Sequence, residues 1–294
     1  MKFIIWSSFY TFQLSQCRHE LELMVKVLQR PNSQTLQRTP VDQFDPPHFD
    51  SMDLIEETIL TFKDFHAKEV SISGPSPAQL APFIDHTLLK PDATASDIET
   101  LCAEATKHNF KSVCVNSSWI PLCSHLLSSA HSLCIPIAVV GFPLGAGLSE
   151  SKAEEARLAI EKGAQEIDMV LPIGRLRDKD YDYVYKDIWG VSIVCRDVPL
   201  KVILETSMLT RAEIVAACMI CKLVGVAFVK TSTGFGGGGA KVEDVQLMKA
   251  VVGDGDEVKA SGGIGTYEDA VRMYNAGARR IGASASVAIV TKRL

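Results

Sequence analysis

From Leu80 onward, short apolar segments alternate with amphipathic segments of helical length, and this alternation constrains the fold more than any other feature of the chain. Most of the apolar segments are near-continuous, which is typical of parallel strands that helices cover. Eight expected strands lie at residues 83–85, 112–115, 135–140, 166–171, 200–205, 227–230, 257–260 and 280–283. Eight strand–helix units in roughly 215 residues predict an α/β protein of the (β/α)8 TIM-barrel type, whose usual length is about 250 residues.

Sequence signals for the ends of helices support these units. Capping boxes are predicted at Ser96–Glu99, Ser151–Glu154, Thr210–Glu213 and Thr266–Asp269. Glycines at positions 163, 225 and 277 each stand where a helix is expected to stop before a strand begins. A doubly wound open sheet is the alternative fold, but it would require a Gly-x-Gly-x-x-Gly turn after the first strand, and residues 83–91 contain none.

The first 76 residues differ from the rest of the chain. Proline-rich and polar stretches at 30–33, 45–48 and 73–77 indicate irregular chain, with helical patches expected at 19–29 and 51–66. We therefore divide the chain into a poorly ordered N-terminal extension, 1–76, and a barrel domain, 77–294. The first fourteen residues resemble a secretory signal only weakly, because polar residues interrupt the apolar stretch. Deleting 1–76 is expected to leave activity largely intact.

Composition narrows the classes of partner and the compartment. A net charge of -5 argues against nucleic acid, which requires a basic surface, and no apolar run is long enough to span a bilayer. Eight cysteines are spread through apolar segments, which indicates reduced thiols and a cytoplasmic protein. Cys218 and Cys221 continue a helical stripe with Ile214, so we interpret them as core residues rather than a redox or zinc pair.

Two lysines are the strongest signal of chemistry. Lys230 and Lys259 each close an apolar segment just before a glycine-rich turn, although lysine is almost never fully buried without a partner. Adjacent strands of a barrel would bring the two amines together at its carboxyl end, where active sites lie. A second cation and partial desolvation both favour a neutral, nucleophilic amine, which indicates Schiff-base chemistry.

Acidic residues lie on other expected strands. Asp85, Asp168 and Glu205 lie on the first, fourth and fifth strands, and Asp168 would face the two amines across the mouth as a proton carrier. The alternative is that the lysines and acids only form structural ion pairs. Lys201 begins its strand, so we interpret it as structural. Cys114 ends the second strand, where it faces either the mouth or the core.

Glycine-rich turns follow the last three strands, at 232–239, 261–263 and 282–284. Backbone amides in such turns bind phosphate, and barrels often place this site after strands seven and eight. A phosphorylated substrate is therefore predicted. The seven histidines are scattered without a His-x-His pair, so neither a metal nor another cofactor is expected.

The ordered motifs resemble the deoxyribose-phosphate aldolase family over about residues 80–290. They are Asp85-His-Thr-Leu-Leu, Ser112-Val-Cys-Val-Asn, Gly141-Phe-Pro-Leu-Gly, Glu166-Ile-Asp-Met-Val, Lys201-Val-Ile-Leu-Glu-Thr, Phe228-Val-Lys-Thr-Ser-Thr-Gly and Val258-Lys-Ala-Ser-Gly-Gly. The resemblance implies a metal-free class I aldolase that reversibly cleaves 2-deoxy-D-ribose 5-phosphate into D-glyceraldehyde 3-phosphate and acetaldehyde. Alternatives are another class I barrel aldolase, of transaldolase or fructose-bisphosphate type, and an inactive barrel that binds sugar phosphates.

The resemblance also implies roles for individual residues. Lys230 would form the Schiff base, Asp168 would carry protons, and Lys259 would take part in proton transfer and perturb the pKa of the attacking amine. Spacing alone does not decide which lysine attacks. Substrate-binding residues are expected at Asp85, Cys114, Glu205 and Thr231, with Gly234, Gly262, Gly263 and Ser284 lining the phosphate pocket. We expect a phosphosugar and acetaldehyde as ligands, a homodimer, and neither nucleic acid nor membrane as partner.

Overall fold

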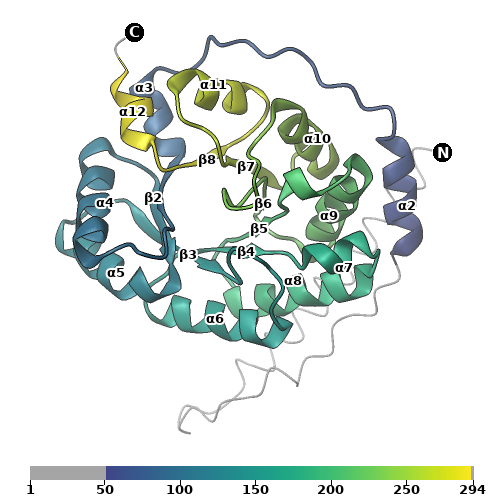
Figure 1. The fold of residues 1–294 in the computed structure, drawn as a ribbon, viewed down its shortest axis with the longest axis horizontal. Helices are drawn as coiled ribbons and strands as arrows, with labels where there is room; N and C mark the ends of the chain where they lie inside the picture. The colour runs from purple at the N-terminus through teal and green to yellow at the C-terminus, as the bar shows by residue number, and fades with distance from the viewer. Residues whose placement is uncertain (1–50, 293–294) are drawn as a thin grey trace, which may run out of the picture. The chain divides into compact units, whose positions relative to one another are not determined.

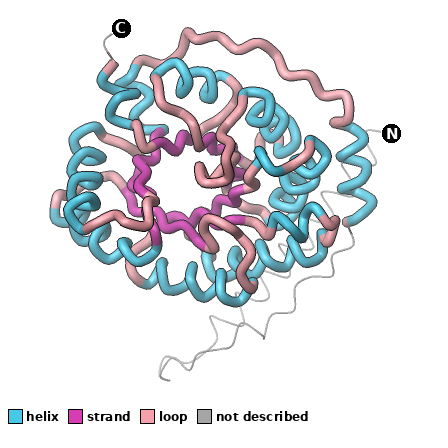
Figure 2. The backbone as a smooth tube through the Cα atoms, in the orientation of Figure 1, coloured by secondary structure: helices cyan, strands magenta, loops and turns pink. Residues whose placement is uncertain are grey.

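Eight parallel strands form a closed ring in which each strand pairs with the next and β8 pairs with β1 (Figures 1 and 2). The computed structural model describes residues 51–292. The strands are β1 (Ile84–Leu88), β2 (Ser112–Asn116), β3 (Ile135–Val140), β4 (Glu166–Val170), β5 (Leu200–Ile203), β6 (Phe228–Lys230), β7 (Glu257–Ser261) and β8 (Arg280–Ala283). The expected (β/α)8 barrel is confirmed, and the open sheet is excluded because the ring is closed.

Helices surround this ring on its outer side (Figure 2). They are α2 (Met52–Thr61), α3 (Pro77–Leu80), α4 (Ala95–His108), α5 (Ile120–Ser129), α6 (Ser149–Glu161), α7 (Ile173–Arg177), α8 (Tyr181–Cys195), α9 (Arg211–Val224), α10 (Val242–Val252), α11 (Tyr267–Asn275) and α12 (Ser286–Thr291), with short 3-10 turns η2 (Ala81–Phe83), η3 (Ser117–Trp119) and η4 (Thr206–Met208). Among the residues described, no helix is long and apolar enough to cross a membrane.

The predicted helix caps are right for two helices and wrong for two. Thr210–Glu213 and Thr266–Asp269 form the capping boxes of α9 and α11. The box of α4 is Thr94–Asp97, two residues earlier than predicted, and α6 begins after Leu148 without a side-chain cap. Ser151 therefore lies inside the first turn of α6, because the chain enters that helix earlier than the local motif indicates.

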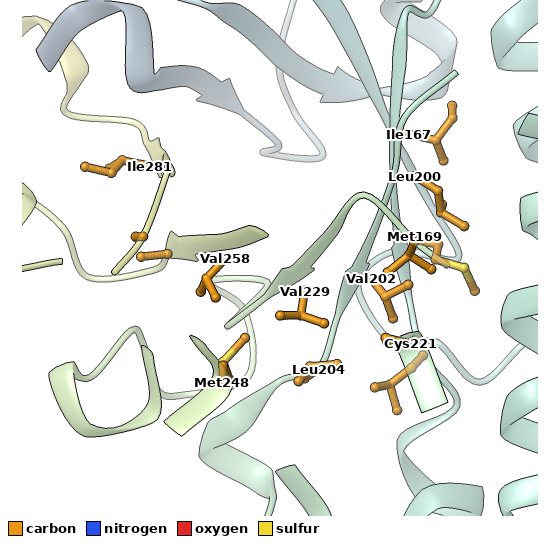
Figure 3. Packing of buried hydrophobic residues seen from close by; sticks show 14 of the residues in the cluster. Ile167, Met169, Leu200, Val202, Leu204, Cys221, Val229, Met248, Val258 and Ile281 are labelled. Atoms are coloured by element: carbon orange, nitrogen blue, oxygen red, sulfur yellow. The ribbon is translucent and has the colours of Figure 1, made fainter. Parts of the chain in front are cut away.

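Successive side chains along each strand point alternately outward, to the helices, and inward, to the barrel interior. Outward side chains such as Val202, Val229 and Val258 pack against the helices, and Figure 3 shows them near Cys221 of α9 and Met248 of α10. Cys218 and Cys221 are fully buried in this core, which confirms that they are packing residues. The inward positions of the same strands carry the charged side chains described below, so the period of two keeps the charges apart from the helix layer.

Residues 51–76 pack on the outside of the barrel. Helix α2, expected within 51–66, lies against α9, and Ile55 is completely buried there. The chain then passes outside α10 and α11 to reach α3 (Figure 1). Backbone groups of this segment bond to α10 and α11: Lys68 exchanges two hydrogen bonds with Gln246, and Asn275 donates to Ser71 and Ser73. The helical patch predicted at 19–29 and the signal-like residues 1–14 lie outside the described residues.

Candidate active site

Seven charged side chains meet inside the barrel. They come from six strands: Asp85 (β1), Glu166 and Asp168 (β4), Lys201 (β5), Lys230 (β6), Lys259 (β7) and Arg280 (β8). All seven are buried. Because buried charges are tolerated only when they are paired, the arrangement of their contacts decides what each side chain does.

Six of the seven side chains form a closed ring in which acids and bases alternate. Lys259 lies 2.5 Å from Asp85 and 2.8 Å from Asp168, and Lys201 lies 2.8 Å from the other oxygen of Asp168. Lys201 continues to Glu166 at 2.6 Å. Arg280 then donates two hydrogen bonds of 3.0 Å to Glu166 and one of 2.7 Å to Asp85. Each ring cation therefore bridges two carboxylates, and we call this set the ionic ring.

Lys230 is attached to the ionic ring but is not part of it. Its Nζ donates to Oδ2 of Asp168 at 2.8 Å, and Asp168 is its one carboxylate partner among the described residues. Lys259 donates to the same oxygen, so the two amines share one acceptor. The side chain of Lys230 is 3% exposed, whereas those of Lys201 and Lys259 are 0% exposed. Lys230 is thus the least deeply buried of the three amines.

Burial and the neighbouring charges act in opposite directions on the pKa values. Burial alone would raise the pKa of Asp168, but Lys201, Lys230 and Lys259 outweigh it and hold that pKa well below its usual range. The pKa of Asp85 is lowered in the same way, against burial, by Lys259 and Arg280. Burial would lower the pKa of Lys259, yet attraction by Asp168 and Asp85 raises it above its ordinary value. Lys259 is therefore a persistent cation.

An apolar wall faces the charges from the other side of the barrel. Cys114 of β2, Ile137 and Val139 of β3, and Leu89 form a buried cluster separate from the helix-facing core, with Phe142 packed against it. Burial raises the pKa of the Cys114 thiol, so this side chain is neutral and belongs to the wall. Phe142 also meets Phe235 of the β6–α10 loop edge-on, with ring centroids 5.3 Å apart.

Glu205 organises the glycine-rich loop after β6. Its carboxylate accepts hydrogen bonds from the backbone N–H of Thr233, at 3.1 Å, and from the Thr233 hydroxyl. A Cβ at Gly236 would lie 2.5 Å from this carboxyl group, so the loop passes directly over it. The predicted substrate-binding Glu205 is thus already occupied by protein partners, and its position supports the loop.

Thr231 is likewise engaged within the protein. Its hydroxyl donates to the carbonyl of Ser261 and accepts from the backbone N–H of Ser261, both at 3.0 Å. These two bonds tie the carboxyl ends of β6 and β7 together immediately after Lys230 and two residues after Lys259. Thr231 therefore fixes the spacing of the two amine-bearing strands.

The predicted phosphate-binding residues follow β6, β7 and β8. Gly234, Gly262 and Gly263 adopt positive φ angles of 84°, 85° and 74°, a region that favours glycine. Ser284 is exposed just before α12. The carbonyl of Gly262 accepts from the N–H of Ala240, which joins the β6–α10 loop to the β7 turn. These turns stand at the same end of the barrel as Lys230.

Sequence reasoning located part of the cluster and missed part. Asp85, Asp168, Lys230 and Lys259 meet as expected, whereas Glu166, Arg280 and Lys201 were not assigned to the site although they complete the ionic ring. The sequence signal for these three residues is a charged side chain near the start of an otherwise apolar strand, at a position that points into the barrel. In residues 51–292, no group of three or more His, Cys, Asp or Glu side chains is arranged to hold a metal.

Comparisons with known proteins agree with this geometry. The model of the DeoC/LacD family of aldolases matches residues 80–292. The chain is similar to a deoxyribose-phosphate aldolase of Finegoldia magna, with 55% identity over 212 residues, which cover 72% of this chain and 99% of that protein. A Bdellovibrio bacteriovorus protein of the same name is 53% identical over 213 residues, which cover 72% of this chain and 96% of that protein.

Solved structures show the same similarity. A Coccidioides immitis chain assigned as a deoxyribose-phosphate aldolase superposes with a TM-score of 0.75 and 41% identity, over 81% of this chain and 96% of that one. The tetrameric deoxyribose-phosphate aldolase of Aeropyrum pernix superposes with a TM-score of 0.69 and 30% identity, over 82% of this chain and 97% of that one.

Proposed function

Because the chain belongs to the DeoC/LacD family of aldolases, we propose that it reversibly cleaves 2-deoxy-D-ribose 5-phosphate into D-glyceraldehyde 3-phosphate and acetaldehyde through a lysine Schiff base. The names of relatives that are 51–55% identical support this substrate. The observation that carries the mechanism is the position of Lys230, the least deeply buried lysine of the cluster, beside Asp168 and the persistent cation Lys259.

Lys230 is the proposed nucleophile. Its neutral amine attacks the C1 aldehyde of the open-chain sugar and, after loss of water, forms an iminium. Lys259 remains charged and donates to the same carboxylate oxygen as Lys230, so a fixed cation lies beside the reacting amine. Lys201 and Lys259 are less suited to attack because each is fully buried between two carboxylates.

Asp168 is the proposed proton acceptor for carbon–carbon cleavage. The C2–C3 bond breaks when the C3 hydroxyl loses its proton, the C3 carbon becomes the aldehyde of glyceraldehyde 3-phosphate, and the bonding electrons pass to C2 and the iminium nitrogen to give an enamine. The nitrogen becomes neutral in this step, so one of the cations that lower the pKa of Asp168 disappears. The carboxylate therefore gains basicity as the proton is released. Returning the proton to C2 and hydrolysing the imine yields acetaldehyde.

The apolar wall supports a preference for a 2-deoxy sugar. Cys114, Ile137 and Val139 offer side chains that suit a C2 methylene group. A hydroxyl at C2 would enter this wall without a good hydrogen-bond partner, and an unpaired buried hydroxyl costs about 1–3 kcal/mol. We propose that the 5-phosphate binds at Gly234, Gly262, Gly263 and Ser284, where positive-φ turns present backbone amides.

Compartment and assembly are also proposals. Seven cysteines among the described residues are free thiols, which supports the cytoplasm. A homodimer remains the proposed assembly, whereas the Aeropyrum pernix relative is described as a tetramer. Sedimentation analysis of the full chain decides between these states.

The test of function is reductive trapping. The full chain is incubated with acetaldehyde and borohydride, and peptide mapping is expected to locate one ethyl group on Lys230. The Lys230→Met variant is expected to lose both the adduct and cleavage of 2-deoxy-D-ribose 5-phosphate. Lys241→Met is the matched control, because Lys241 is an exposed lysine at the end of the same loop and is expected to leave both unchanged.

Two results would contradict the proposal. An adduct on Lys201 or Lys259 in place of Lys230 would overturn the choice of nucleophile. Comparable turnover of a ribose phosphate or a ketose bisphosphate would overturn the proposed substrate, because the apolar wall would then play no part in selection.

A further inference from the structure

We propose that Glu155 of α6 is a positioning residue for the aldolase reaction: it holds Phe142 over the apolar wall and so sustains the preference for a sugar without a C2 hydroxyl. This inference rests on the proposed function, because it concerns how the same site selects its substrate. It goes further, because it assigns part of that selectivity to a helix that lies outside the ring of strands (Figure 2).

Phe142 is a part of the wall that a loop supplies. It follows Gly141, and Gly141 comes directly after the carboxyl end of β3. The ring of Phe142 packs on the wall and meets Phe235 edge-on, so it lies where the wall opens to the mouth of the barrel. An aromatic ring at this place excludes water, which would otherwise solvate a hydroxyl group held against the wall.

Glu155 holds the residue before Phe142. Its Oε2 accepts a hydrogen bond of 2.9 Å from the backbone N–H of Gly141, and its Oε1 accepts one of 2.9 Å from the hydroxyl of Ser117. Ser117 directly follows β2, as Gly141 directly follows β3. One half-buried carboxylate therefore joins the carboxyl ends of the two strands that carry the wall.

Lys152, which lies one turn earlier on α6, packs against the other side of Gly141. A Cβ at Gly141 would lie 3.2 Å from Cε of Lys152, so the stem of this lysine is in direct contact with the loop. The amine of Lys152 donates to the carbonyl of Val170 at 3.1 Å and to the carboxylate of Asp187 at 2.8 Å. The lysine stem is therefore fixed, and Gly141 is held between it and Glu155.

The turn that contains Phe142 is closed on itself. Gly141 has a φ of 61°, and its carbonyl accepts a hydrogen bond of 2.8 Å from the N–H of Gly145. A Cβ at Gly145 would lie 2.1 Å from the carbonyl oxygen of Leu171, so the end of the turn packs against the chain after β4. Phe142 thus stands in a turn whose first residue is anchored by Glu155. Loss of this anchor frees the N–H of Gly141 and lets the ring leave the wall.

The experiment separates the reach of the side chain at position 155 from its charge. Glu155→Gln keeps the length and one acceptor oxygen for Gly141, and its amide group can donate to the hydroxyl of Ser117. Glu155→Asp keeps the charge but is shorter by one carbon–carbon bond, roughly 1.5 Å, so the two hydrogen bonds pass out of range. Selectivity is measured as kcat/KM for 2-deoxy-D-ribose 5-phosphate divided by kcat/KM for D-ribose 5-phosphate, from the release of D-glyceraldehyde 3-phosphate.

The two variants are expected to differ. Glu155→Asp is expected to lower the selectivity about tenfold, because an apolar pocket rejects an added hydroxyl group by about 100-fold and the ring of Phe142 supplies part of that discrimination. Glu155→Gln is expected to keep the wild-type selectivity, because it keeps the anchor. Trapping with an equimolar mixture of acetaldehyde and glycolaldehyde gives an independent ratio, of ethyl to hydroxyethyl groups on Lys230, within one sample. This ratio is expected to fall in Glu155→Asp, while the yield of adduct with acetaldehyde alone is unchanged.

Controls test whether Glu155 acts through Phe142. Glu161 lies on the same helix, is exposed and pairs with Arg157, so Glu161→Asp and Glu161→Gln are expected to leave both ratios unchanged. Phe142→Ala is expected to lower the selectivity by itself, and Glu155→Asp is expected to have no further effect in that background. Urea unfolding checks the fold of each variant. If Phe142→Ala does not fold, the comparison of Glu155→Gln with Glu155→Asp still carries the test.

Each outcome has a defined meaning. A fall of selectivity in Glu155→Asp that Glu155→Gln does not share supports the inference, and so does the lack of a further effect beside Phe142→Ala. Wild-type selectivity in Glu155→Asp, equal falls in both variants, or additive effects of Glu155→Asp and Phe142→Ala overturn it. Failure of the wild-type chain to form an adduct at Lys230 would instead refute the proposed function, so the two failures are distinguishable.

Discussion

Helix α2 provides a test of whether the segment before the barrel is part of its cooperative unit. Ile55 is completely buried between α2 and the barrel helices and joins the main core, whereas Leu60 on the same helix is 70% exposed. Ile55→Ala removes buried methyl groups and leaves a cavity, which costs about 2–5 kcal/mol. Leu60→Ala changes an exposed position, where substitutions usually stay within about 0.5 kcal/mol. The two variants alter the same helix with a similar loss of volume, so they are matched.

The expected result follows from the size of the folded unit. For domains of about 150–250 residues, each kcal/mol corresponds to roughly 2–4 °C in Tm. Ile55→Ala is therefore expected to lower Tm by several degrees and to shift the urea midpoint without changing the m-value. Leu60→Ala is expected to leave both unchanged. The kcat of both variants is expected to match wild type well below the melting temperature, because α2 does not contact the ionic ring.

Deletion of residues 1–76 is expected to destabilise the protein, contrary to the expectation from sequence that activity would be largely intact. Besides Ile55, the segment contributes Phe62, Phe65 and Val70 as partly buried contacts, and Arg211 and Tyr267 bond to the backbone of Lys63 and Pro75. Removing 1–76 loses all of these, at a cost comparable to a typical net stability of about 5–15 kcal/mol. A chain lacking 1–50 is expected to fold, and one lacking 1–76 to be severely destabilised. Equal melting of Ile55→Ala and Leu60→Ala would refute this argument.

Two other substitutions test features of the loops. Glu205→Gln weakens the bonds that hold Thr233, so KM for 2-deoxy-D-ribose 5-phosphate is expected to rise about tenfold while acetaldehyde trapping is unchanged; equal losses in both assays would contradict the role in the loop. Burial raises the pKa of Asp256 from 3.8 to about 6. Ionisation of Asp256 therefore lowers the free energy of unfolding, progressively as the pH rises between these two values and fully above a pH of about 6. Asp256→Asn is expected to stabilise the fold by about 1–2 kcal/mol at pH 8, after discounting for partial exposure, and to have no such effect below pH 4; urea unfolding at both values measures this, and a gain that is equal at both would contradict it.

The barrel was predictable from sequence because its signals are local. Each strand is a short apolar run, and glycines 163, 225 and 277, all with positive φ, end the preceding helices as expected. Lys230 and Lys259 were detected because a lysine at the end of an apolar strand is costly without a function. The two lysines meet because β6 and β7 are adjacent strands in which Lys230 and Lys259 are opposite each other in register.

The ionic ring was less accessible to sequence reasoning because it depends on which strand faces which across the barrel. Arg280 and Lys201 lie at the start of their strands, and active-site residues of such barrels are expected at the opposite, carboxyl ends. Glu205 was expected to end its strand, but β5 ends at Ile203, and the left-handed backbone of Glu205, with a φ of 57°, redirects the chain into the following loop. The packing of 51–76 was also missed, since Ile55 contacts α9, more than 150 residues later.

The salt links of Arg280 have a consequence for how the chain folds. This guanidinium of the last strand joins Asp85 of the first strand and Glu166 of the fourth, so each of these carboxylates keeps only one of its two cations until the eighth strand has docked. A barrel that has not closed would therefore leave two carboxylates only partly compensated, and a slip of one residue in register would turn the charged side chains of that strand toward the helices. The ionic ring therefore makes an unclosed barrel, and a barrel with a slipped strand register, less stable than the closed one.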